Sequence, residues 1–276
     1  MTAALTLSTD IDGFDRLQLG RRTILVRPDW KGCLEKDLLG DFSSVPDAAR
    51  KIYAHGRVRH FSYRPEGAPA RVFVRRARRG GLLGAVLGGL YAGTGRPLQE
   101  LRAVQAARAA GVSVPEPLAV IAEESVGPFY RLTIVSREIE GASDLLSLAG
   151  TLPPAGKRDL LRRVADEMRR LHEAGVYHAD LTMKNILVSA DAVYIIDLDK
   201  ARLRARRDER HDAENLARLN RSIVKLFGGR GAITRTDKIR FLLRYLGRRD
   251  RVRELSRLCA QGLWAHRLWW TLSGQS

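Results

Sequence analysis

The sequence predicts an α+β fold with two lobes, a β-rich N-terminal lobe at residues 1–140 and a mainly helical C-terminal lobe at residues 141–276. Short runs rich in β-branched and aromatic residues dominate the first half, whereas apolar residues at helical spacing dominate the second. A chain of 276 residues, 45% hydrophobic and 29% charged, is long enough for one large domain or two lobes. Only Cys33 and Cys259 are present, so no disulfide framework or structural zinc site is expected and a reducing compartment is favoured.

The predicted elements of the N-terminal lobe are four strands and one helix. "TILVR" (residues 23–27) and "ARVFVRR" (residues 70–76) are expected to be strands, and "LQELRAVQAARAAG" (residues 98–111) is expected to be a helix. A strand pair follows at "PEPLAVIA" (residues 115–122) and "FYRLTIVSREI" (residues 129–139). After "EGASD" the pattern turns helical, so the lobes are expected to meet near residue 140.

One long helix and one hairpin are predicted in the C-terminal lobe. "KRDLLRRVADEMRRLHEAG" (residues 157–175) is expected to be a helix that Gly175 ends. "NILV" (residues 185–188) and "VYII" (residues 193–196) flank the turn-like "SADA" and indicate a hairpin. The apolar residues at helical spacing are Leu160, Leu161, Val164, Met168 and Leu171.

Four polar residues, His178, Asp180, Asn185 and Asp197, stand at the ends of the two hairpin strands. Phosphoryl transfer from ATP needs a carboxylate that accepts the proton of the attacking hydroxyl, and oxygen ligands that hold Mg²⁺ against the phosphates. Asp180 is the predicted proton acceptor and Asn185 and Asp197 the predicted metal ligands, because this is the spacing of the kinase H-x-D-L-x-x-x-N loop and its later Asp. His178 is grouped with Asp180 as a catalytic candidate, although a histidine here more often supports the loop backbone. The structural alternative is that Asp180 and Asn185 cap turns while His178 is a core histidine.

Four segments of the chain resemble the lipopolysaccharide kinase family, most closely the 3-deoxy-D-manno-octulosonic acid (Kdo) kinases. They are "GVYHADLTMKNILV", "YIIDLDKARL", "RRGGLLGAVLGGLY" and "NLARLNRSIVK". The resemblance runs from about residue 71 to residue 225. It implies a protein-kinase-like fold with the ATP site in the cleft between the lobes, ATP and Mg²⁺ as cofactors, and phosphorylation of a sugar hydroxyl of Kdo on a lipid A precursor at the cytoplasmic face of the inner membrane.

The strand lysine with which a kinase holds the nucleotide phosphates is missing, because no Lys occurs between Lys51 and Lys157. Arg75 stands at the end of the predicted strand "RVFVR", and a guanidinium can bind phosphate through two parallel hydrogen bonds. Glu100, on the following helix, is its predicted partner. The neighbours Arg76, Arg78 and Arg79 are alternatives, and so is a solvated strand end. No G-x-G-x-x-G is present, and "HGRVRHF" (residues 55–61) is a weak candidate for the phosphate-covering loop.

The net charge of +17 indicates a polyanionic partner: nucleic acid, an anionic membrane, or a phosphorylated substrate. With the resemblance in hand, an anionic glycolipid is expected and nucleic acid is not. Lys184, Lys200 and Arg202 are candidates for binding it, with solvated surface residues as the alternative. Asp199 is expected to be a structural partner of arginines rather than a second metal ligand. "LD" follows Asp197 in place of Phe-Gly and no A-P-E follows, which argues against a regulated protein kinase.

The sequence favours a cytoplasmic protein, soluble or peripheral on the inner membrane. It has no secretion signal, and its most apolar window, residues 80–93, is about six residues short of the roughly 20 that a membrane span needs. Trp264, Trp269 and Trp270 beside Arg267 suit a membrane interface, but a helix docked on its own core is preferred. The other functions considered are a kinase of the same fold for another saccharide, small molecule or Rio-type protein substrate, and a non-catalytic pseudokinase.

Overall fold

The computed structural model describes residues 11–55, 58–77, 90–92, 95–127, 129–227 and 233–255, together with residues 257 and 259. The chain forms two compact units. The N-terminal unit is Met1–Arg102 with Pro115–Glu140, and the C-terminal unit is Ala103–Val114 with Gly141–Ser276. The units are not contiguous in sequence, because a short segment before residue 115 packs with the C-terminal one. The domain limits proposed from the sequence stay a prediction.

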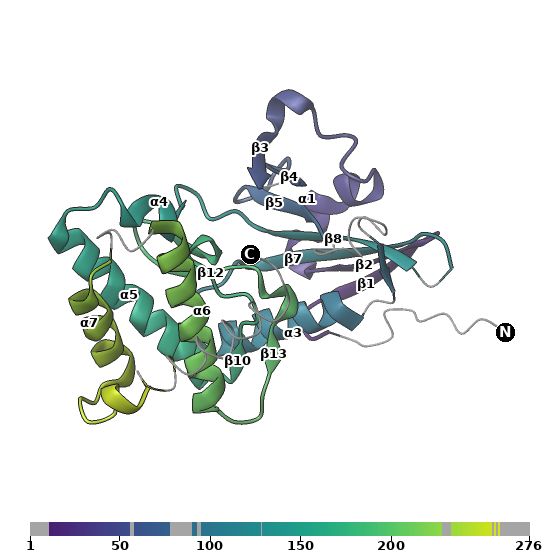
Figure 1. Cartoon of the computed structure of the whole chain (residues 1–276). Helices are drawn as coiled ribbons and strands as arrows, with labels where there is room; N and C mark the ends of the chain where they lie inside the picture. Colours follow the sequence, from purple (N-terminus) through teal and green to yellow (C-terminus); the bar gives the residue numbers. More distant parts are fainter. Residues whose placement is uncertain are drawn as a thin grey trace, which may run out of the picture. The chain divides into compact units, whose positions relative to one another are not determined.

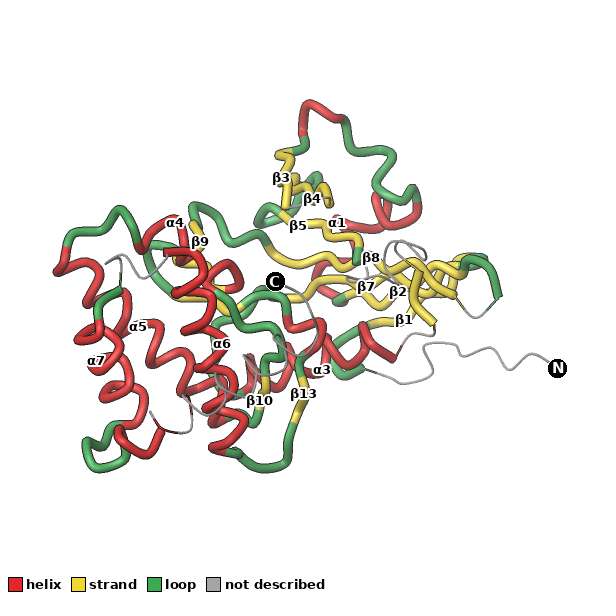
Figure 2. The backbone as a smooth tube through the Cα atoms, viewed as in Figure 1, coloured by secondary structure: helices red, strands yellow, loops and turns green. Residues whose placement is uncertain are grey.

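An antiparallel sheet forms the N-terminal unit (Figures 1 and 2). Its strands in the described residues are β1 (Asp15–Leu19), β2 (Arg22–Val26), β3 (Lys51–His55), β4 (Val58–Tyr63), β5 (Val72–Arg76), β6 (Leu90–Ala92), β7 (Pro117–Glu124) and β8 (Phe129–Arg137). They are arranged in the order β1-β2-β7-β8-β5-β4-β3, with β6 also paired to β8. The strands predicted around residues 23–27, 70–76, 115–122 and 129–139 are therefore confirmed as β2, β5, β7 and β8.

Both faces of this sheet carry a core. Successive residues of a strand point to opposite faces, so Ile24 and Val26 of β2 pack with α1 (Pro28–Leu39), whereas Leu25 packs with the start of α3 (Gly95–Ala109). α1 begins at a proline, whose fixed φ suits the first turn, and buries Trp30, Leu34 and Leu38 at a spacing of four residues. A short 3₁₀ turn, η1 (Asp47–Ala49), precedes β3.

The C-terminal unit is mainly helical, as the sequence predicts. Its helices are α4 (Leu145–Ala149), α5 (Pro154–Glu173), α6 (Glu209–Phe227) and α7 (Arg235–Leu246). The remaining described elements are β9 (Ser143–Asp144), β10 (Val176–Tyr177), η2 (Met183–Asn185), β11 (Ile186–Val188), β12 (Val193–Ile195), η3 (Leu198–Lys200) and β13 (Arg202–Leu203). β11 pairs antiparallel with β12, which confirms the predicted hairpin.

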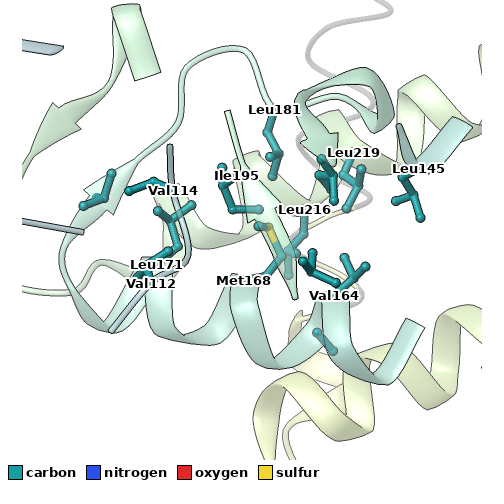
Figure 3. Packing of buried hydrophobic residues seen from close by; sticks show 14 of the residues in the cluster. Val112, Val114, Leu145, Val164, Met168, Leu171, Leu181, Ile195, Leu216 and Leu219 are labelled. Atoms are coloured by element: carbon teal, nitrogen blue, oxygen red, sulfur yellow. The ribbon is translucent and has the colours of Figure 1, made fainter. Parts of the chain in front are cut away.

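The core of the C-terminal unit is built on α5 (Figure 3). All five apolar residues of the predicted helix are buried, and Figure 3 shows Val164 and Met168 of α5 near Leu216 of α6, with Leu171 beside Val112. Val112 and Val114 reach the same cluster from the segment that follows α3. Both α5 and α6 contact β10, the strand that leads into the polar residues following α5.

Three sequence predictions concern residues outside the described part of the chain. They are the arginines at positions 78 and 79, most of the apolar window at 80–93, and the tryptophans at 264, 269 and 270. Among the residues that the structure describes, no helix has both the length and the apolar character to cross a membrane.

Candidate active site

His178 is the buried centre of the loop at residues 178–185, called the catalytic loop below. It is 1% exposed, and its Nε2 lies 3.0 Å from the Ile196 carbonyl oxygen. The Asp180 backbone N–H donates to its Nδ1 at 3.2 Å. Burial lowers the pKa of His178, so the ring is neutral near pH 7, with Nε2 as donor and Nδ1 as acceptor. Both ring nitrogens therefore bind backbone groups, which suits a role in holding the loop; the catalytic role considered for His178 stays a prediction.

Asn215 of α6 holds the catalytic loop from the other side, and sequence reasoning did not single it out. Its Oδ1 accepts from the His178 backbone N–H at 3.1 Å, and its Nδ2 donates to the His178 carbonyl at 3.0 Å. The same Oδ1 lies 3.2 Å from Nε2 of His172, which is also buried. Asn215 is 0% exposed, so these bonds satisfy groups that water cannot reach. The one signal in the sequence was its position at the head of "NLARLNRSIVK".

Asp180 and Asn185 are joined across the turn of the catalytic loop. The Asn185 Nδ2 donates to the Asp180 carbonyl at 2.8 Å, and the Asn185 carbonyl accepts from the Ile196 N–H at 3.0 Å. The first bond directs the amide nitrogen into the loop, which leaves the side-chain oxygen as the end able to bind a cation. The Asp180 side chain is half-exposed, so it is accessible to a substrate hydroxyl.

Asp197 follows β12 in a left-handed backbone conformation, with φ 64° and ψ 56°. A non-glycine residue rarely adopts this region, and such positions concentrate at functional sites. The carboxylates of Asp197, Asp180 and Asp199 are close enough to His178 to oppose the pKa shift that burial causes. Backbone contacts therefore connect the three candidate residues to this histidine: His178 binds the Asp180 N–H and the carbonyl of Ile196, the residue before Asp197, and Asn185 binds the Asp180 carbonyl.

The oxygen ligands available here suit Mg²⁺. Mg²⁺ is usually bound by one or two protein carboxylates together with substrate phosphates and water. An amide oxygen of Asn185 and the carboxylate of Asp197 fit that pattern. Within the described residues no group of three or more His, Cys, Asp or Glu side chains is arranged to hold a metal by itself. The remaining ligands would have to come from a nucleotide and water.

Arg75 and Glu100 form an ion pair within the N-terminal unit, between β5 and α3. Both side chains are largely buried, at 23% and 11% exposure. The contact joins a cation on a strand to an acid on the following helix, as the sequence predicts. Its role in nucleotide binding stays a prediction. Arg76 points to the opposite face of β5, is 67% exposed, and pairs with Asp41 at 2.9 Å.

The candidate phosphate-covering segment, residues 55–61, comprises the end of β3, most of β4, and two residues outside the described part. β3 and β4 pair antiparallel, and β4 pairs with β5, the strand that carries Arg75. The segment is thus a hairpin next to the strand of the ion pair.

The three candidate substrate-binding residues lie around the catalytic loop. Lys200 of η3 has its Nζ 3.9 Å from Oδ2 of Asp180, with both side chains about half-exposed. Lys184 is exposed within the loop itself. Arg202 is exposed on β13, where it pairs with Tyr177 of β10, the strand that leads into the loop.

Comparison with known proteins identifies the family. The model of the lipopolysaccharide kinase (Kdo/WaaP) family matches residues 66–245. The chain belongs to this family. It is 35% identical over 163 residues to a 3-deoxy-D-manno-octulosonic acid kinase of Vibrio cholerae serotype O1, covering 57% of this chain and 67% of the relative. The kinase of the same name from Photobacterium profundum is 30% identical over 223 residues, covering 79% of this chain and 89% of the relative.

A solved structure of this family also matches. "WaaP in complex with acyl carrier protein" is 27% identical, with a TM-score of 0.60, and the match covers 88% of this chain and 96% of that chain. The protein-kinase-like fold predicted from the sequence is confirmed. The chain is accordingly a phosphotransferase that acts on a sugar hydroxyl.

Proposed function

We propose that this protein transfers the γ-phosphoryl group of ATP to a sugar hydroxyl of Kdo on a lipid A precursor, in lipopolysaccharide core biosynthesis. The observation that supports the proposal most is the set of backbone contacts that links Asp180, Asn185 and the residue before Asp197 to His178. The names of the curated relatives supply the acceptor. A non-catalytic binding protein would have no need of a proton acceptor and metal ligands together.

Asp180 acts as the proton acceptor. The acceptor hydroxyl oxygen forms a bond to the γ-phosphorus, the bond from that phosphorus to the β–γ bridging oxygen breaks, and ADP leaves. The hydroxyl proton passes to the Asp180 carboxylate. His178 keeps the Asp180 backbone in place through the 3.2 Å bond to its N–H, so the carboxylate does not have to be ordered when substrate arrives.

Asn185 and Asp197 would hold Mg²⁺, which when bound neutralises charge on the nucleotide phosphates. Asp197 stands in a left-handed backbone conformation after β12, and the N–H of its neighbour Ile196 binds the Asn185 carbonyl, so the two residues lie at the same end of the hairpin. Arg75 would bind the α and β phosphates, held by Glu100. Two guanidinium donors aimed at one phosphate would replace the point charge of the lysine found in other kinases.

An acidic acceptor suits the charge of the chain. Lys200 lies beside Asp180, Lys184 is exposed within the loop, and Arg202 pairs with the strand that leads into it, so these cations would attract a carboxylate or phosphate. The net charge of +17 also favours peripheral contact with an anionic membrane surface, where such a glycolipid is found. The 3.9 Å ion pair between Lys200 and Asp180 is half-exposed and therefore weak. Lys200 would exchange this contact for one with the anionic acceptor.

A mass-spectrometric transfer assay tests the proposal. Purified protein receives ATP, Mg²⁺ and a Kdo-capped lipid A precursor, with Asp180→Ala in parallel. We expect the precursor to gain one phosphate, and the variant to lose about 10²–10⁴-fold in turnover while ATP binding stays within a few-fold, since a general base acts in the transition state. Equal turnover in the variant would remove Asp180 from this role. No gain by the wild type on this precursor, with ATP still bound, would reject Kdo as the acceptor.

A further inference from the structure

Two side chains of helix α6 form hydrogen bonds with the backbone of the catalytic loop. Asn215 binds both backbone groups of His178, and two turns later the Ser222 hydroxyl accepts from the Met183 N–H at 3.2 Å. α6 also packs against β10 and η2, the elements before and within the loop. Residues of α6 between these two contacts therefore lie along the loop, with Arg218 on the side that faces it and Arg221 on the adjacent side.

Arg218 and Arg221 are half-buried cations with no acidic partner among the residues that the structure describes. In the part of the chain that the structure describes, Arg218 Nε is buried and has no hydrogen-bond partner. Neither guanidinium lies within 4.0 Å of an Asp or Glu oxygen among the described residues. Burial and the neighbouring Arg218 guanidinium lower the pKa of Arg221. The two charges thus interact with each other, an arrangement that destabilises both.

By contrast, three other arginines of the C-terminal unit have acidic partners. Arg207 binds Asp212 at 2.6 Å, Arg244 binds Asp166 at 2.7 Å, and Arg251 binds Glu209. Nor can an acid from the rest of the chain readily fill the gap. The residues outside the described part include a single acidic side chain, Asp10, besides the terminal carboxylate.

We propose that Arg218 and Arg221 bind an oxyanion of the acceptor beside the catalytic loop. A half-buried pair of like charges is stabilised by an anion placed between them. Two guanidiniums can bind one carboxylate or phosphate through parallel N–H···O bonds, which would fix the orientation of the sugar as well as attract it. This inference rests on the proposed function, because an acidic glycolipid acceptor is what supplies the oxyanion.

The test compares Arg218→Gln and Arg221→Gln with Arg249→Gln, a control that removes the same charge from an exposed position of the same unit. We expect the KM for the Kdo-capped precursor to rise about 10-fold or more in each of the first two variants, with the KM for ATP unchanged. Arg218→Lys should recover part of the loss, because it restores the charge without the forked donors. Arg249→Gln should behave as the wild type. An unchanged acceptor KM, or a raised ATP KM, in the Arg218 and Arg221 variants would overturn the inference.

Two further arms identify the oxyanion and separate the inference from the proposed function. With a precursor stripped of its phosphates, the effect of the variants should persist if the sugar carboxylate is bound and vanish if a lipid phosphate is bound. Equilibrium titration of the precursor without ATP measures binding whether or not transfer occurs. Weaker binding in the two variants than in Arg249→Gln supports the site even if the wild type transfers no phosphate. Equal binding in all, or no binding by the wild type, overturns it.

Discussion

The catalytic loop of the C-terminal unit and the Arg75–Glu100 pair of the N-terminal unit are built by different means. In the loop, buried side chains bind backbone: Asn215 and His178 together tie four main-chain groups. In the N-terminal unit, a cationic side chain on β5 forms an ion pair with an acidic side chain on α3. Hydrogen bonds to backbone in a buried site fix the geometry of the loop and contribute to folding stability. In the ion pair, Glu100 holds the guanidinium of Arg75, whose proposed role is to bind the nucleotide phosphates. Damage to the loop should therefore reduce both stability and turnover, whereas damage to the pair should change nucleotide affinity first.

The largest expected effect is the loss of Asn215. Asn215→Ala leaves the His178 N–H and carbonyl buried without partners, and each such group costs about 1–3 kcal/mol. We expect the free energy of unfolding to fall by about 4 kcal/mol, measured by urea denaturation, with a large loss of turnover. Asn220→Ala is the matched control on the same helix, because the Asn220 Oδ1 is buried with no hydrogen-bond partner in the described structure. Similar losses in both variants would mean that the loop is not held through Asn215.

The turn that leads from α5 into the loop gives the next effect. Gly175 has φ 69°, and a Cβ there would overlap the Arg204 backbone carbonyl oxygen. Gly175→Ala should cost about 3 kcal/mol of unfolding free energy, the sum of a left-handed conformation and a backbone clash. Gly111, which follows α3 with φ 74°, has no atom within 4 Å of its Cβ position, so Gly111→Ala should cost only about 1 kcal/mol. Equal costs measured by thermal unfolding would contradict the clash.

Arg75 provides the contrasting test in the N-terminal unit. Arg75→Ala should raise the KM for ATP and lower turnover, for a loss of roughly 10- to 100-fold in kcat/KM, since hydrogen bonds to charged groups contribute about 1.5–3 kcal/mol. The kcat/KM of Arg75→Lys should lie between those of the wild type and Arg75→Ala, because an ammonium keeps the charge but not the paired donors. Arg76→Ala, on the exposed face of the same strand, should leave nucleotide dependence unchanged. If Arg76→Ala raises the KM for ATP and Arg75→Ala does not, the role in nucleotide binding belongs to Arg76.

The two regions also differ in how far the sequence predicts them. The polar residues of the loop lie within twenty positions of one another, and the hairpin that carries them has a local pattern, so spacing alone brings them together. Glu100 was predicted as the partner of Arg75 because strand and helix follow one another along the chain. Asn215 and Ser222 were missed because their contacts with His178 and Met183 span 37 and 39 residues. No periodicity in α6 distinguishes a polar residue that binds a distant backbone from one that is merely solvated.

The pH dependence of stability gives the smallest effect and isolates His178. Burial lowers the folded-state pKa of His178 below the unfolded value of about 6.5, so the unfolded chain binds the proton more readily. The contribution of the neutral His178 ring to the free energy of unfolding is therefore fully present above about pH 6.5. It is lost as the pH falls toward the folded-state pKa, with a slope of at most about 1.4 kcal/mol per pH unit. His178→Gln should be less stable at pH 7.5 and lose less further stability at pH 5.5, measured by urea unfolding at both. Glu167, whose pKa burial raises, acts in the opposite sense, and His172, whose pKa burial lowers, acts in the same sense; both are present in the two proteins, so the comparison reports the difference that His178 makes. Parallel losses in the two proteins would mean that His178 is not held neutral, and that the loop is positioned by Asn215 without it.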